Sequence, residues 1–108
     1  MMNKYSVEYI EKIGLPTFIK AINIAHCRYY FSRSNMTYYK TSIYSKYWFI
    51  MGDKLYFVSS DLYWNRERTY RIFSINLNNG DIDKLTNTHH PTLRDAYKEL
   101  KEYEKSQK

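Results

Sequence analysis

The apolar pattern of this chain changes period twice, and this change restricts the folds that the chain can adopt. Between residues 28 and 85 the sequence is dense in aromatic and β-branched residues, which favour strands. Two turn signals divide this stretch, one around Gly52 and one at residues 78–81, where Asn and Gly80 both tolerate a positive φ. The strands beside these turns are residues 47–50, 55–59, 70–77 and 82–85. We therefore predict an antiparallel β-meander of about four strands, with residues 61–68 as its longest polar loop.

The residues before this stretch have helical spacing. Ser6 is suited to cap a short helix that Gly14 ends and that Pro16 separates from the next segment. Thr17 could cap a second helix running to about His26, although three β-branched isoleucines keep a strand alternative open. With a turn between the two helices, residues 6–26 would form a helix-turn-helix-like pair.

The clearest helix signal lies at the C-terminal end. Thr92 and Asp95 have the spacing of a capping box. The apolar residues beyond this cap recur at helical intervals and form one stripe, comprising Leu93, Ala96, Tyr97, Leu100 and Tyr103. The helix is predicted to run to about residue 104. The fold class that these patterns predict is a single α+β domain over residues 1–108, with short N-terminal helices, a central antiparallel meander and a C-terminal amphipathic helix.

The positive charge of the chain is concentrated in residues 12–52. This segment holds six Lys or Arg residues, ten aromatic residues and no Asp or Glu, and it accounts for essentially all of the net charge of +6. A basic, aromatic surface without carboxylates suits a polyanion, although half of the aromatics could instead lie in the core under a solvated basic face. The candidate binding residues lie in the predicted strand part of the segment and are Arg28, Arg33, Tyr38, Tyr39, Lys40, Tyr44 and Lys46.

A second candidate patch lies in the predicted polar loop. It combines aromatic and cationic residues and comprises Tyr63, Trp64, Arg66 and Arg68, with Arg71 close behind. Such a patch could hold a phosphate or an acidic protein surface. Asp61 and Glu67 could equally neutralise it locally, and because Trp and Arg dominate protein interfaces the patch fits protein binding as well.

No pattern in the chain indicates catalysis or metal binding. Phosphate-binding glycine loops, zinc-finger spacings and nucleophile elbows are absent from the sequence, which has three glycines in all. His89 and His90 are adjacent, so on an extended segment they point in opposite directions and are poorly placed to share a metal. His26 and Cys27 are no better placed as a nucleophilic pair. We therefore expect no catalytic residues, no metal and no cofactor.

The location of the protein is predicted from its single cysteine and its hydropathy. Cys27 cannot form an intramolecular disulfide, which fits a reducing compartment. No apolar run approaches the roughly 20 residues that span a bilayer, and the N-terminus has no signal-peptide core. We expect a cytoplasmic protein, in its own cell or in a host, without a membrane partner.

In size, in its Tyr-, Asn- and Lys-rich composition and in its motif-free α+β layout, the chain resembles small accessory proteins encoded by phages and mobile elements of low-GC bacteria, among them anti-CRISPR inhibitors. The resemblance implies an inhibitor of a host defence effector and carries over no individual residue. The chain departs from many such inhibitors because they are acidic mimics of DNA and it is basic. It would therefore act by binding guide RNA, DNA or an acidic protein surface.

These observations predict a small non-enzymatic binding protein that engages a nucleic-acid or nucleoprotein target through a basic, tyrosine-rich surface. One alternative is an inhibitor or adaptor that binds a protein without contacting nucleic acid. Another is a small helix-turn-helix-like transcription regulator, which is less favoured because residues 15–25 carry only Lys20 as a base-reading cation. The oligomeric state stays open.

Overall fold

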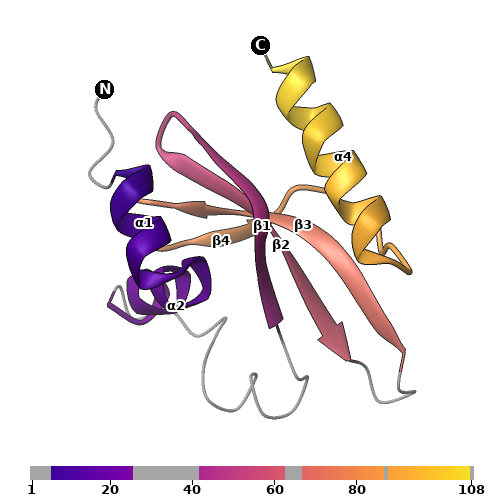
Figure 1. Ribbon diagram of the computed structural model, residues 1–108, viewed down its shortest axis with the longest axis horizontal. Helices are drawn as coiled ribbons and strands as arrows, with labels where there is room; N and C mark the ends of the chain where they lie inside the picture. The colour runs from indigo at the N-terminus through magenta and orange to yellow at the C-terminus, as the bar shows by residue number, and fades with distance from the viewer. Residues whose placement is uncertain (1–5, 26–41, 63–66, 87, 108) are drawn as a thin grey trace.

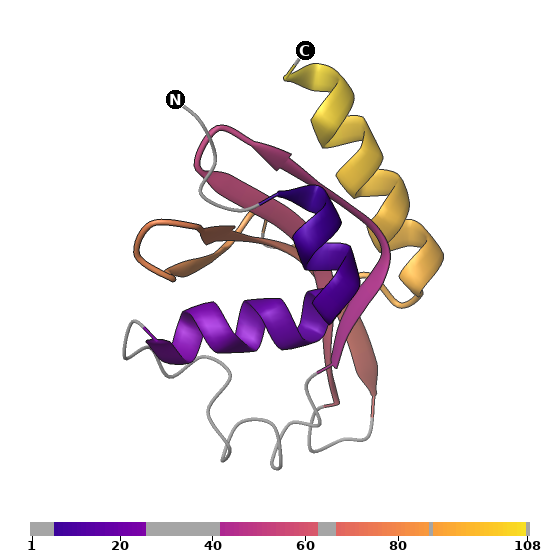
Figure 2. The same cartoon turned by 60° about the vertical axis from the view of Figure 1, so that its left-hand side comes forward.

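A four-stranded antiparallel sheet lies between helices on both of its faces (Figures 1 and 2). The computed structural model describes residues 6–25, 42–62, 67–86 and 88–107. The elements in this part of the chain are α1 (Val7–Ile13), α2 (Leu15–Ala25), β1 (Ser42–Met51), β2 (Lys54–Leu62), β3 (Arg68–Asn76), β4 (Ile82–Lys84) and α4 (Leu93–Ser106). The strands are ordered β1-β2-β3-β4 in the sheet, so each strand pairs with the next in sequence. The predicted α+β fold with a central meander is confirmed.

The first helix begins and ends where its capping residues indicate. The Ser6 hydroxyl accepts a hydrogen bond from the Tyr9 N–H at 3.1 Å, and this satisfies a donor that the helix itself leaves unpaired. At the other end Gly14 has a φ of 93°, a conformation that a residue with a Cβ adopts only with strain.

The second helix begins earlier than predicted. It starts at Leu15 and ends at Ala25, so Thr17 lies inside its first turn rather than at its N-cap. Pro16 stands at the start of the helix, where its missing N–H leaves no hydrogen bond unmade and its fixed φ suits the helix. The predicted cap at Thr17 is wrong because Pro16 lies within the first turn of the helix rather than before it.

Two hydrophobic cores lie on opposite faces of the sheet. The core under α1 and α2 contains Ile10, Leu15, Phe18, Ile19, Ile22, Leu55, Phe57, Phe73, Ile75 and Leu77. The core under α4 contains Phe49, Tyr56, Val58, Ile72, Ala96, Tyr97 and Leu100. Neighbouring residues of β2 and β3 contribute to opposite cores, because successive side chains of a strand alternate between faces. The central strands are therefore buried on both sides.

The hairpin turns lie where the glycines indicate. Gly52 has a φ of 64° and lies between β1 and β2, and Gly80 has a φ of 75° and lies between β3 and β4, as predicted. Strand pairing between β2 and β3 continues to Leu62 opposite Arg68. The predicted polar loop over residues 61–68 is thus too long at both ends, since residues 61, 62 and 68 belong to the ladder.

Helix α4 is capped as predicted and is held against the sheet by the segment that leads into it. The Thr92 hydroxyl accepts a hydrogen bond from the Asp95 N–H at 3.2 Å. Before the cap, the backbones of Tyr70 and His90 exchange two hydrogen bonds of 2.9 and 2.8 Å. The helix ends at Ser106, two residues beyond the predicted end.

Candidate functional site

The edge strand β1 contains a wide bulge opposite β2. Tyr44 pairs with Val58 and Phe49 pairs with Tyr56, so four residues of β1 lie across from one residue of β2, Phe57. β1 therefore has three more residues than β2 in this stretch. Because three is odd, the alternation of side chains changes phase across the bulge, and both Tyr44 and Phe49 contact the core under α4.

The side chains of the four bulge residues, 45–48, point in different directions. Ser45 and Lys46 are exposed at the edge of the sheet. Tyr47 packs against the core under α4, whereas Trp48 packs against the core under α1 and α2. The strand alternation expected for residues 47–50 is confirmed. A bulge on an edge strand also disfavours pairing with another chain, because its backbone groups no longer form a regular row.

A groove of about 930 Å³ lies between this bulge and the first half of α4. Its lining includes four cations, one carboxylate and two tyrosines, which are Lys46, Arg94, Lys98, Lys101, Asp95, Tyr47 and Tyr97. Lys46 comes from β1 and the other three cations come from α4. The groove is concave, basic and aromatic, which is the character predicted for residues 12–52, although only Lys46 and Tyr47 of its lining come from that segment.

Most of the charges of α4 are segregated on its surface, with the exception of Glu104, which contacts Tyr47. Three of its four cations and three of its four acids recur at i, i+4 and i+7, and these acids stand one residue later than these cations. They are Arg94, Lys98 and Lys101, and Asp95, Glu99 and Glu102. Residues at this spacing form one stripe along a helix, so α4 has a basic stripe next to an acidic one. The three cations of the basic stripe line the groove beside β1.

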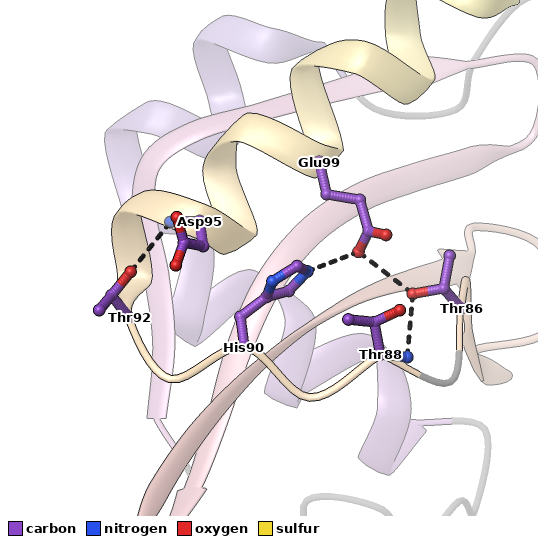
Figure 3. A network of polar contacts seen from close by, with 6 residues as sticks. All are labelled: Thr86, Thr88, His90, Thr92, Asp95 and Glu99. Carbon is purple, nitrogen blue, oxygen red and sulfur yellow. Dashed lines mark hydrogen bonds and ion pairs between the residues drawn. The ribbon is translucent and has the colours of Figure 1, made fainter.

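Contacts on the acidic side of α4 hold the helix in this rotation. Glu99 Oε1 accepts a hydrogen bond from the Thr86 hydroxyl at 3.2 Å and lies 2.8 Å from His90 Nε2 (Figure 3). Thr88 N–H in turn donates to the Thr86 hydroxyl at 3.4 Å. Glu99 thus ties the acidic stripe to the segment that joins β4 to α4, and the basic stripe lies on the neighbouring side of the helix.

Tyr47 connects the two walls of the groove. Its hydroxyl donates a hydrogen bond to Glu104, and the Lys101 Nζ lies 5.1 Å from the centroid of its ring. The second distance is that of a cation–π contact. Burial raises the pKa of Tyr97, which also lines the groove, because it disfavours the phenolate.

Of the residues predicted to bind a partner, Lys46 alone among the described ones lines this groove. Tyr44 is half-buried, its hydroxyl lies 2.8 Å from the Ser60 hydroxyl, and its ring centroid is 5.7 Å from that of Tyr70. Arg68 donates to the same Ser60 hydroxyl at 2.6 Å. Both side chains therefore have structural contacts within the sheet. The remaining predicted residues, Arg28, Arg33, Tyr38, Tyr39, Lys40, Tyr63, Trp64 and Arg66, lie outside the described part of the chain.

Sequence reasoning missed the cations of α4 as site residues. We predicted no binding role for them, although the separation of these charges into two stripes is visible in the sequence. Their role depends on which stripe faces β1, and this is set by the packing of the apolar side of α4 on the sheet together with the contacts of Glu99. The sequence therefore showed the two stripes of α4 but not which of them faces β1.

The histidines beside this region have separate partners. His90 contacts Glu99, whereas His89 Nδ1 lies 3.3 Å from the Thr69 hydroxyl. Partial burial, together with the cations Arg71 and Lys84, lowers the pKa of His89. Within the described residues no group of three or more His, Cys, Asp or Glu side chains is placed to hold a metal ion. In that same part of the chain, none of the helices has the length and apolarity to cross a bilayer.

Comparison with known proteins identifies the family of this chain. Neither the curated proteins nor the solved structures contain a match to it. A family of unknown function, DUF7447, matches residues 17–101, which include every residue that lines the groove. Because this match covers more than half of the sequence, the chain belongs to the DUF7447 family.

Proposed function

We propose that this protein is a non-enzymatic binding protein that engages nucleic acid, free or within a nucleoprotein, through the groove between the β1 bulge and α4. The observation that carries the proposal is that four cations and one carboxylate line a concave site with two tyrosines, while the neighbouring carboxylate of Glu104 accepts a hydrogen bond from Tyr47. A concave surface with an excess of positive charge attracts a polyanion, and cations that neutralise phosphates release condensed counterions.

The length of the basic stripe suits a nucleic-acid backbone. Arg94 and Lys101 are seven residues apart, which is about 10 Å along a helix. This distance corresponds to about three phosphates of a stacked strand at ~3.4 Å each. Lys46 extends the row of cations across the groove to β1. Four phosphate contacts are therefore within the reach of the site.

The composition of the groove favours nucleic acid over a protein partner. Three of its four cations are lysines, and Lys is depleted from protein interfaces whereas Arg and Trp are enriched there. An inhibitor or adaptor that binds an acidic protein surface is the alternative. It predicts a partner that is retained by the full chain from a lysate after nuclease treatment and is lost in the Lys98→Gln variant.

The helix-turn-helix alternative is less well supported. The buried side of α2 packs Phe18, Ile19 and Ile22 against the sheet. Lys20, the sole cation of α2, is only half-exposed. Inhibition of a nucleic-acid-handling host effector, the function that the resemblance to phage-encoded proteins implies, is a narrower form of the proposal and would use the same groove.

The first experiment is a titration of a fluorescently labelled 12-nucleotide single strand with the full chain, followed by anisotropy at several salt concentrations between 50 and 200 mM. The logarithm of the association constant should fall with that of the salt concentration with a slope of about −3, at roughly 0.7 for each phosphate contacted. Lys98→Gln should weaken binding by about tenfold and make the slope shallower by about 0.7, since it removes one charge-assisted contact.

The matched control is Lys84→Gln. Lys84 is exposed on β4 and pairs across the strands with Phe73, so it lies on the face of the sheet that α1 and α2 cover, away from the groove. This variant also loses one positive charge, but its affinity for the strand should stay within about twofold of the wild type, because only long-range, salt-screened attraction is lost. An absence of binding at 50 mM salt, a flat salt response, or equal losses in the two variants would overturn the proposal.

A further inference from the structure

The aromatic ring of Tyr47 has a position in the groove that charge alone does not explain. It projects from the bulge of an edge strand, next to exposed Lys46, and lines the groove together with three cations of α4. Its contact with Phe49 is tilted, with ring centroids 6.2 Å apart and planes at 49°, so the two rings are not stacked. One face of the Tyr47 ring is turned toward the ammonium group of Lys101.

The contact between Lys101 and this ring can be exchanged for a contact with a ligand. A cation over a half-buried aromatic ring such as that of Tyr47 is weakly held, whereas a hydrogen bond from an ammonium group to a phosphate is charge-assisted and stronger. A phosphate in the groove would therefore draw Lys101 off Tyr47. The ring face that Lys101 leaves would then be open to a flat, polarisable group, and a nucleobase is the group that accompanies each phosphate.

From this geometry we infer that the groove is a single-strand site in which Tyr47 stacks on one unpaired base while Lys101 contacts the adjoining phosphate. In a duplex each base is already stacked and paired, so it cannot reach a tyrosine on the groove wall, although the backbone can still meet the lysines. The hydrogen bond to Glu104 fixes the hydroxyl end of the Tyr47 ring against α4. This inference rests on the proposed function and adds a preference for unpaired bases.

The test compares ligands that share a backbone and differ in their bases. The full-length protein is titrated with a thymidine 12-mer, with a 12-mer of abasic sites, and with a 12-base-pair duplex at one salt concentration. The thymidine strand should bind about tenfold more tightly than the abasic strand, since stacking of one base on an aromatic side chain has an effect of this order. Equal affinity for the thymidine and abasic strands would overturn the inference, and this comparison needs no variant.

Variants then assign the preference to Tyr47. Tyr47→Leu should bind the thymidine and abasic strands equally while keeping the salt dependence of the wild type, and Tyr47→Phe should keep the preference because it retains the ring. If Tyr47→Leu still prefers the thymidine strand, Tyr47 is not the stacking residue and the inference falls. If the protein binds the three ligands equally and Lys98→Gln weakens all of them, the proposed function stands and this inference alone is overturned. If none of the ligands binds, both are overturned.

Discussion

At the scale of single residues, Asn23 connects two parts of the fold that are far apart in sequence. Its side chain is 1% exposed, and its Nδ2 donates a hydrogen bond to the carbonyl oxygen of Gly80 at 3.0 Å. Helix α2 is thereby joined to the turn between β3 and β4. A buried amide on the apolar face of a helix is tolerated because this bond satisfies it.

Replacing Asn23 with Ala should lower the free energy of unfolding by about 2 kcal/mol, because the Gly80 carbonyl loses its partner in a buried site. Chemical denaturation with guanidinium measures the change. Asn78→Ala is the control, since Asn78 is exposed in the same turn region and its replacement should alter stability by less than about 0.5 kcal/mol. Equal effects of the two variants would show that the contact of Asn23 with Gly80 contributes nothing.

At the scale of elements, α4 both closes a core and supplies most of the groove cations. Ala96, Tyr97 and Leu100 are buried on one side of the helix, and its basic stripe lies on the neighbouring side. The rotation that buries the apolar stripe also carries the cations toward β1. Packing and charge are coupled in this element because they occupy adjacent sides of one helix.

Removal of the α4 N-cap should weaken the helix without changing a groove cation. Thr92→Ala deletes the hydroxyl that accepts from the Asp95 N–H and should cost about 1 kcal/mol of stability. Thermal unfolding followed by circular dichroism checks this value. Thr88→Ala is the matched control, because Thr88 is exposed and precedes the helix. A loss in Thr88→Ala as large as that in Thr92→Ala would contradict the assignment of the cap.

At the scale of the whole molecule, the two cores share the same pair of central strands. Residues of β2 and β3 alternate between the core under α1 and α2 and the core under α4. A strand buried on both faces cannot lose one covering layer without exposing apolar side chains to water. The helices on the two faces are therefore expected to unfold together with the sheet.

This coupling predicts one cooperative transition for the wild type and for variants in either core. Ile19→Ala and Leu100→Ala each truncate a fully buried side chain, one in each core, and each should cost about 3 kcal/mol. Helicity by circular dichroism and tryptophan fluorescence should give coincident denaturation curves. Curves that separate in Leu100→Ala would show that α4 detaches independently of the rest.

The local features of the fold are set by short stretches of sequence. Ser6 and Thr92 cap helices as expected because an N-cap depends on the residue and its next three neighbours. The turns at Gly52 and Gly80 were predictable for the same reason, since a positive φ is a property of one residue. The start of α2 was predicted too late because a proline can stand before a helix or within its first turn, and Pro16 does the latter.

The sequence by itself therefore determined the order and type of the elements, and the tertiary structure decided where the candidate site lies. The β1 bulge is a mismatch of register between two strands, so neither strand encodes it alone. The direction of the basic stripe depends on how the apolar side of α4 packs on the sheet and on the contacts of Glu99 with Thr86 and His90. The charges were readable in the sequence, but their meeting in one groove depends on contacts between segments distant in the chain.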